Sequence, residues 1–100
     1  RCVNQEDIKS IKRTMKRYNG RVKACYEREL KGNPDLSGKV VVSFEILTSG
    51  AVTAAGIEEN TTGNNDLESC ILKVVRRIKF NPPPPDDVEV SGYPYIFSAQ

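Results

Sequence analysis

Hydrophobic and polar residues alternate most regularly in the stretch GKVVVSFEILTSGAV, residues 38–52. Every second residue over 40–46 is hydrophobic, while the residues between them are mostly polar. This two-residue period is typical of a β-strand that buries one face. The turn-forming segment TSG at 48–50 interrupts the pattern before a second extended run begins. The pattern predicts a β-hairpin with strands at about 38–47 and 51–58.

The N-terminal third has the three- and four-residue spacing of a helix that packs on a core. The hydrophobic residues with this spacing are Ile8, Ile11, Met15, Tyr18, Val22, Cys25, Tyr26 and Leu30. Asn19-Gly20 is a turn signal and is expected to break or kink the helix. We therefore expect two helices, or one kinked helix, over 5–31.

A second helical pattern follows the polar loop EENTTGNN at 58–65. Its hydrophobic residues are Leu67, Cys70, Ile71, Val74, Val75 and Ile78. The four prolines at 82–85 cannot continue the helix, and they join two core-forming elements, so we interpret them as a rigid connector. The segment VEVSGYPYIF at 88–97 is predicted to be the final strand.

The predicted element order is ααββαβ, which defines an α+β fold. We expect residues 1–100 to form a single domain, cut from a longer membrane-anchored protein because the chain begins at Arg1 rather than at methionine. One face of the first strand should pack against the helices to form the core. The expected core residues are Val40, Val42, Phe44, Ile46, Leu67, Ile71, Val74 and Ile78.

The net charge is only +2, but it is unevenly distributed along the chain. Residues 1–31 hold ten Lys and Arg against four Asp and Glu, whereas residues 32–100 hold five against nine. A basic segment of this kind binds nucleic acid, acidic lipid or an acidic partner, or it is simply a solvated helix face. The solvated face is the simpler interpretation, because aromatic residues do not alternate with the charges as base stacking requires.

The sequence contains no histidine, so the commonest general base of enzymes is missing. The acidic pairs at 58–59 and 86–87 are neighbours in predicted loops, where carboxylates usually serve solubility. Cysteines at 2, 25 and 70 match no zinc pattern, which leaves buried thiols or one disulfide as alternatives. We expect no catalytic residues, no metal site and no cofactor.

Three segments in this order resemble the C-terminal domain of TonB-family energy transducers. They are GKVVVSFEILTSGAV, LESCILKVVRRIKFNPPP and VSGYPYIF. The matching positions are Gly38, Val40, Val42, Phe44, Ile46, Gly50 and Val52, then Leu67, Cys70, Val75, Lys79, Phe80 and Pro82. The segments CYEREL at 25–30 and NPDLSGKV at 33–40 resemble the AgmX/PglI C-terminal subgroup, which occurs in gliding-motility and envelope proteins of myxobacteria.

The resemblance implies a non-enzymatic periplasmic domain, tethered to the inner membrane through a segment absent from this chain. Such a domain couples an inner-membrane motor to outer-membrane or periplasmic partners, and it binds a partner peptide by strand addition. For the gliding subgroup, the implied role is a connection across the envelope between the motility motor and outer-membrane parts.

Two site predictions follow. Cys25 and Cys70 should form a disulfide, with Cys2 free, because each lies on a hydrophobic helix face and the implied compartment is oxidising. The last strand should be the partner-binding edge, since Pro94 fits an edge position. The predicted edge residues are Glu89, Val90, Ser91, Gly92, Tyr93 and Tyr95.

Two other functions compete with this interpretation. The first alternative is a structural module that forms a homodimer through its last strand. The second is a nucleic-acid-binding module that uses its basic helices. We expect a protein partner and no nucleic acid.

Overall fold

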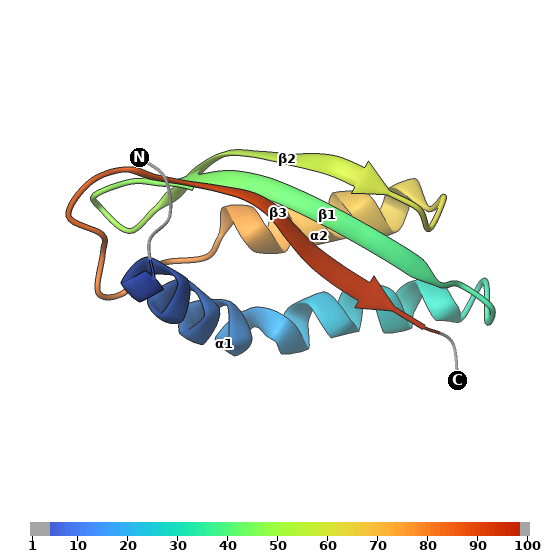
Figure 1. The fold of residues 1–100 in the computed structure, drawn as a ribbon. Helices are drawn as coiled ribbons and strands as arrows, with labels where there is room; N and C mark the ends of the chain where they lie inside the picture. Colours follow the sequence, from blue (N-terminus) through green and yellow to red (C-terminus); the bar gives the residue numbers. More distant parts are fainter. Residues whose placement is uncertain (1–4, 99–100) are drawn as a thin grey trace.

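The computed structural model describes residues 5–98 and has two layers, with a three-stranded sheet on one side and two helices on the other (Figure 1). The elements along the chain are α1 (Gln5–Leu30), β1 (Gly38–Ile46), β2 (Val52–Asn60), α2 (Asn65–Arg76) and β3 (Val88–Phe97). The α+β class and the order of helix, hairpin, helix and strand are as predicted.

The N-terminal segment is one helix, so the alternative of two helices is excluded. It continues through Asn19 and Gly20, both of which are exposed. Met15 and Val22, on either side of this pair, are buried with 0% and 2% exposure. A glycine inside a helix costs only about 1 kcal/mol, and the packing of these two side chains outweighs that cost.

Strand β1 lies at the centre of the sheet, in the order β2-β1-β3, and pairs antiparallel with both neighbours. Strand β2 extends to Asn60, two residues further than predicted, and it carries irregularities of register opposite β1. The loop before α2 is correspondingly shorter than expected.

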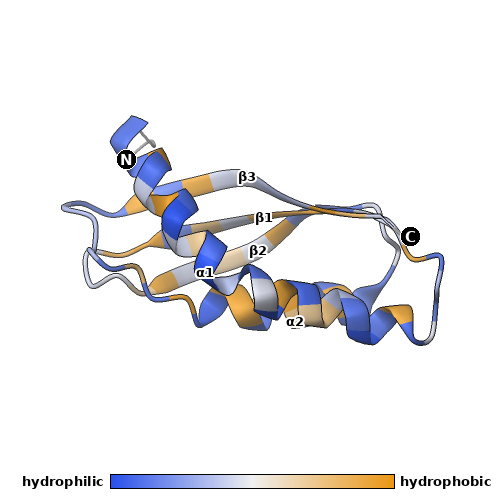
Figure 2. Ribbon diagram, turned by 90° about the horizontal axis from the view of Figure 1, so that it is seen from below, coloured by the Kyte–Doolittle hydropathy of each residue, from blue (hydrophilic) through white to orange (hydrophobic). Residues whose placement is uncertain are grey.

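The core lies between the sheet and the helices, which cover one face of it (Figure 2). The predicted face of β1 is buried, as are three of the four predicted α2-side residues, while Val74 is partly buried. The buried residues among those predicted are Val40, Val42, Phe44, Ile46, Leu67, Ile71 and Ile78.

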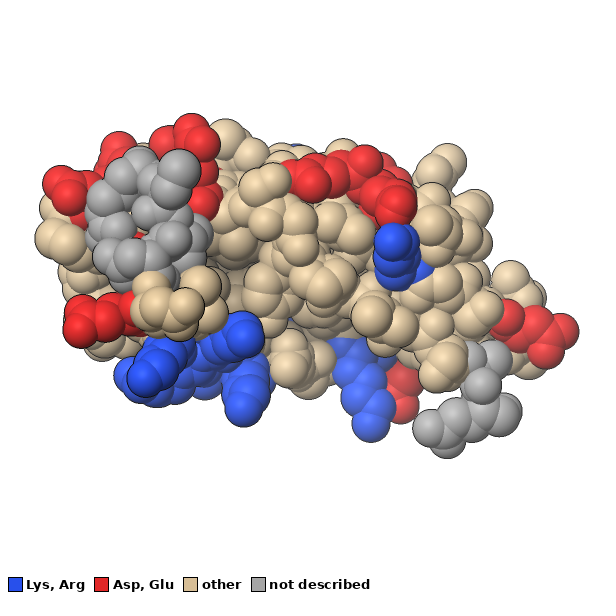
Figure 3. Space-filling model, in the orientation of Figure 1, with Lys and Arg blue, Asp and Glu red and all other residues tan. Residues whose placement is uncertain are grey.

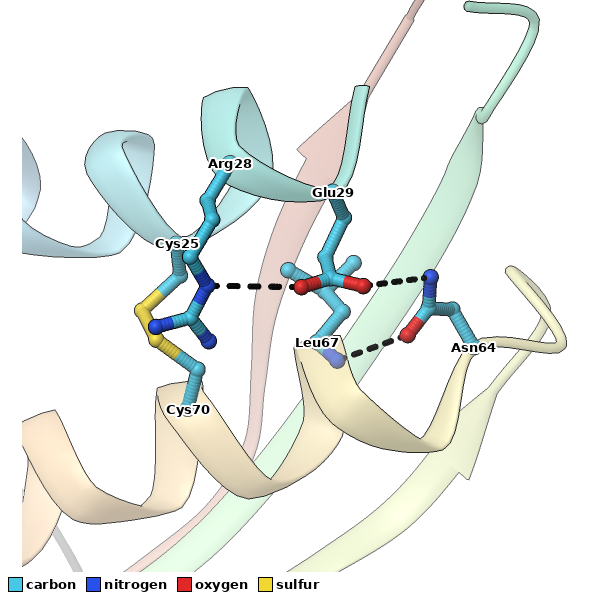
Figure 4. A network of polar contacts seen from close by, with 6 residues as sticks. All are labelled: Cys25, Arg28, Glu29, Asn64, Leu67 and Cys70. Atoms are coloured by element: carbon cyan, nitrogen blue, oxygen red, sulfur yellow. Dashed lines mark hydrogen bonds and ion pairs between the residues drawn. A yellow bond between two sulfur atoms is a disulfide. The ribbon is translucent and has the colours of Figure 1, made fainter. Parts of the chain in front are cut away.

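The end of α1 is joined to the start of α2 by a disulfide and a polar network (Figure 4). Cys25 and Cys70 are bonded, with 5.8 Å between their Cα atoms. Asn64 caps α2 by accepting a hydrogen bond from Leu67 N at 2.8 Å, and its Nδ2 donates to Glu29 Oε1 at 3.1 Å. Cys2 lies outside the described residues. The two helices are therefore fixed to each other independently of the sheet.

Candidate functional site

Strand β3 forms one edge of the sheet. It pairs with β1 along one side, and among residues 5–98 no strand pairs with its other side. An edge of this kind presents unpaired main-chain N–H and C=O groups to any extended chain that approaches. The N–H and C=O groups of β3 that point away from β1 are the ones available to such a chain.

The hydrogen bonds at the start of β1 determine these directions. The carbonyl of Lys39 accepts a hydrogen bond from Thr61 N at 2.9 Å, so Lys39 directs its main chain toward the β2 side. Main-chain groups of successive strand residues point to alternate sides, and Val40 therefore directs its groups toward β3. Its partner there is Tyr95, whose N–H and C=O consequently point back toward β1.

The same alternation points the main chain of Pro94 and Ile96 away from β1, toward the free edge. Pro94 has no N–H, so no ladder donor is lost at this position. The outward groups are the carbonyl of Pro94 and both the N–H and the C=O of Ile96. The side chain of Ile96 is 77% exposed, which makes it an exposed large hydrophobic residue at the edge itself.

A β-bulge divides β3 into two parts. Val42 pairs with Tyr93 and Phe44 pairs with Val90, so β3 has one residue more than β1 between these pairs. Gly92 has φ +72°, a conformation that L side chains rarely adopt, and nothing lies within 4 Å of the position of a Cβ there. Beyond the bulge, residues 93–97 pair with β1 without interruption.

A side chain of β2, at the opposite edge of the sheet, forms hydrogen bonds with the residues of the bulge. Glu58 of β2 accepts a hydrogen bond of 2.6 Å from Ser91 Oγ and one of 3.3 Å from Gly92 N. These bonds span the central strand on the face that no helix covers. They fix the point at which the regular part of β3 begins.

A groove runs between α1 and β3, on both sides of the bulge, and we call it the edge groove. It consists of two hollows of about 410 and 530 Å³ that share Tyr93 and Pro94. Its α1 wall is formed by Ile8, Ile11, Lys12, Asn19, Val22, Lys23 and Tyr26. Its β3 wall is formed by Val90, Ser91, Gly92, Tyr93, Pro94, Tyr95, Ile96 and Phe97, with Ser98 beyond the strand.

Aromatic side chains make up much of the groove. The Tyr26 ring stacks on that of Phe97 with 4.7 Å between centroids, and the Tyr93 and Tyr95 rings lie 5.4 Å apart. The hydroxyl of Tyr95 is buried and has no hydrogen-bond partner among the described residues. Burial raises the pKa of both the Tyr93 and Tyr95 hydroxyls, and the nearby Tyr93 raises that of Tyr95 further.

The structure separates the predicted edge residues into two groups. Val90, Ser91, Gly92, Tyr93 and Tyr95 line the edge groove. Glu89 does not, because it is exposed and borders a hollow on the uncovered face of the sheet instead, with Glu45 as its cross-strand partner.

Sequence reasoning missed the α1 wall of the groove and the role of Ile96. Extending the strict alternation by two residues, from Pro94 to Ile96, would have placed Ile96 on the exposed side with its main chain outward. No local signal marks the α1 wall, because the packing of a helix beside a strand edge depends on tertiary contacts.

The described residues contain no group of three or more His, Cys, Asp or Glu side chains that could hold a metal ion. Within the described part of the chain, no helix is both long and hydrophobic enough to cross a membrane.

An α+β domain with an unpaired strand beside a partly hydrophobic groove has the features of a domain that binds an extended segment of another protein. Residues 33–98 match the profile of the family described as Gram-negative bacterial TonB protein C-terminal, so the chain belongs to that family. No curated protein and no solved structure matches the chain. The family consists of non-enzymatic, periplasmic protein-interaction domains that serve energy transduction.

The matched residues include both hairpin strands, α2 and β3, but not α1. The resemblance to the TonB family that the sequence indicated is confirmed over residues 33–98. The wall that α1 contributes to the edge groove lies outside the matched part of the chain.

Proposed function

We propose that this domain binds an outer-membrane or periplasmic protein by adding an extended segment of that protein to the sheet beside β3. The upstream part of the protein would tether the domain to the inner membrane and to an ion-driven motor there. The domain would then transmit force from the motor to its partner. The observation that carries this proposal is the free main chain of Pro94 and Ile96 at the edge of β3, next to a groove.

The edge groove supports strand addition for a second reason. Main-chain hydrogen bonds supply affinity in this mode, while pockets for alternate side chains supply specificity. An added strand would direct every second side chain toward α1, where the half-buried Ile8 offers a hydrophobic contact beside the mostly buried Ile11 and Tyr26. The half-buried Tyr93, whose ring packs beside that of the buried Tyr95, would provide flat surface on the strand side.

The opposite edge, formed by β2, is less suited to receive a strand. Its register with β1 shifts at two places, and Ala54 has φ +54°. Glu58 and Glu59 add charge near its end. Bulges and charges of this kind are devices that protect sheet edges from pairing.

We also propose that the domain belongs to the gliding-motility subgroup, on the basis of the segments CYEREL and NPDLSGKV. In that setting the partner would be an outer-membrane component of the motility apparatus. A second copy of the domain could occupy the same edge, and this gives the competing function of a structural homodimer.

Photo-crosslinking in cells tests the proposal. A photoreactive amino acid at Ile96 of the full-length protein should crosslink to an envelope protein, while the same group at the exposed Thr53 of β2 should not. Crosslinking of position 96 only to another copy of the protein, with a dimer in sedimentation, would favour the homodimer. Crosslinks from position 53 alone would place the partner at the other edge.

A further inference from the structure

One part of α1 carries a concentration of positive charge, of which only Lys12 and Lys23 line the edge groove; the proposed strand addition leaves the rest unexplained. Residues 9–23 include seven Lys and Arg and no Asp or Glu. The remaining residues of the chain hold eight Lys and Arg against thirteen Asp and Glu. We call these seven cations the basic face; they are Lys9, Lys12, Arg13, Lys16, Arg17, Arg21 and Lys23.

All seven side chains are exposed, and none forms an ion pair with another described residue. They recur mostly at three- and four-residue steps, so they share one side of the helix. The other side of α1 buries Ile11, Met15 and Val22 in the core. Arg21 alone contacts an aromatic ring, lying 5.2 Å from the centroid of Tyr18. The other side chains of the basic face are exposed and have no partner among residues 5–98.

The two layers of the domain have opposite charge. The three strands contain one Lys and four Glu, namely Lys39, Glu45, Glu58, Glu59 and Glu89. In Figure 3, Lys and Arg gather along the helix side of the molecule, while Asp and Glu are prominent on the sheet side and at both ends. The charge distribution of the domain is therefore asymmetric: anions attract its helix layer and repel its sheet layer.

We propose that the basic face lies against an anionic lipid bilayer. Clusters of four to eight Lys and Arg are typical of surfaces that bind acidic lipids. The basic face extends over 14 residue steps of helix, about 21 Å, on a convex rod. A convex row of this length contacts an extended anionic surface better than it encloses a small ligand.

The depth of this contact follows from the composition of α1. Within residues 9–23, every exposed residue is charged, asparagine or glycine. The helix has no exposed hydrophobic side chain there to insert among acyl chains, so the domain would rest on headgroups. Attraction of this kind is screened within about 8 Å at physiological salt.

A bilayer fits the observations better than nucleic acid does. The family is periplasmic, so membrane surfaces border its compartment on both sides. Base stacking requires free aromatic rings among the cations, whereas Tyr18 is half-buried and covered by Arg21. Lying on its helix layer, the domain would turn the acidic sheet face away from the membrane and leave Ile96 at the side, open to a partner.

Vesicle co-sedimentation with two charge-matched variants tests this proposal. The first variant removes three cations from the basic face (Arg13→Gln, Lys16→Gln, Arg17→Gln). The second removes three exposed cations elsewhere (Arg28→Gln, Lys31→Gln, Lys39→Gln). Both lower the formal net charge of +2 by the same amount. Glutamine has nearly the helix propensity of lysine and arginine, and circular dichroism verifies that both variants fold.

The probe is vesicles of phosphatidylcholine containing about 30% phosphatidylglycerol, a lipid that supplies the negative surface potential. The parent protein should bind these vesicles at low salt and not bind pure phosphatidylcholine. The first variant should lose about 100-fold in its partition coefficient, and the second should lose less than about 5-fold. Equal losses in both variants, or equal binding to neutral vesicles, would overturn the proposal. Binding to duplex DNA without binding to vesicles would overturn it in favour of nucleic acid.

Discussion

The ring of Tyr26 in α1 stacks on the ring of Phe97 at the end of β3, with 4.7 Å between their centroids. The Tyr26 hydroxyl also donates a hydrogen bond to the carbonyl of Leu36, in the connection that leads to β1. One side chain thus joins the helix outside the family match to the edge strand within it. We infer that Tyr26 holds the wall of the edge groove in place.

Truncating this contact should weaken the domain. Tyr26→Ala should lower the free energy of unfolding by about 3–5 kcal/mol, because it removes a buried aromatic ring. Tyr26→Phe keeps the ring and should cost only about 1 kcal/mol for the lost hydrogen bond. Urea denaturation of both variants measures the difference. If the two losses are equal, the stacking on Phe97 contributes nothing and the hydroxyl alone matters.

The disulfide between Cys25 and Cys70 should be present in the protein purified from an oxidising compartment. Mass spectrometry without reduction should find the two cysteines in one linked peptide pair. Replacing both by alanine should lower the unfolding free energy by about 2–4 kcal/mol, because the bond closes a loop with a sequence separation of 45. Two alkylatable thiols at 25 and 70 in the unfolded, unreduced protein would contradict the prediction.

The buried face of β1 supplies a third prediction. Phe44 is 3% exposed and lies 6.2 Å from the ring centroid of Phe80. Phe44→Ala should therefore lower the unfolding free energy by about 3–5 kcal/mol. Val41, on the uncovered face of the same strand, provides the control, and Val41→Ala should cost about 1 kcal/mol or less. Similar losses for the two variants would mean that the wrong face of β1 is assigned to the core.

Replacing Tyr95 by phenylalanine should stabilise the folded domain. Its buried hydroxyl lacks a hydrogen-bond partner among the described residues, so Tyr95→Phe should raise the unfolding free energy at neutral pH by about 1 kcal/mol. Tyr93→Phe, at a half-buried residue, should change the unfolding free energy less. A loss of stability in Tyr95→Phe would show that the hydroxyl is bonded after all.

The same variant should change the alkaline limit of stability. Burial raises the pKa of the Tyr95 hydroxyl above its ordinary value of 10.0, so the folded state holds the proton more tightly than the unfolded state. Stability is unaffected by this group below pH 10.0 and falls as the pH rises beyond it. Tyr95→Phe should lose less stability than the parent over that range.

The sequence was sufficient for the parts of the fold that local patterns control. The alternation around Val42 and the helical spacing around Ile71 identified the buried faces, since each period maps directly onto one side of its element. The break predicted at Asn19-Gly20 was wrong, because the packing of Met15 and Val22 outweighs the small local preference of these two residues for a turn.

The candidate site was only partly predictable for the same physical reason. Pro94 marked the edge strand, because its missing N–H restricts where it can lie in a sheet. The bulge at Gly92 depends on Glu58 of another strand, and the groove depends on α1 lying beside β3. Neither contact leaves a periodic trace in the local sequence.

Amide hydrogen exchange at Ile96 tests strand addition at β3 most directly. The N–H of this residue points to the free edge, and an added strand would engage it in a ladder hydrogen bond. A synthetic peptide that covers the segment crosslinked to position 96 should slow exchange of the Ile96 amide by at least about tenfold and shift resonances over 90–97. Ile96→Pro removes this N–H and should abolish binding, whereas Ile96→Ser should retain it. Protection confined to α1 or to β2, with the Ile96 amide unchanged, would contradict the account.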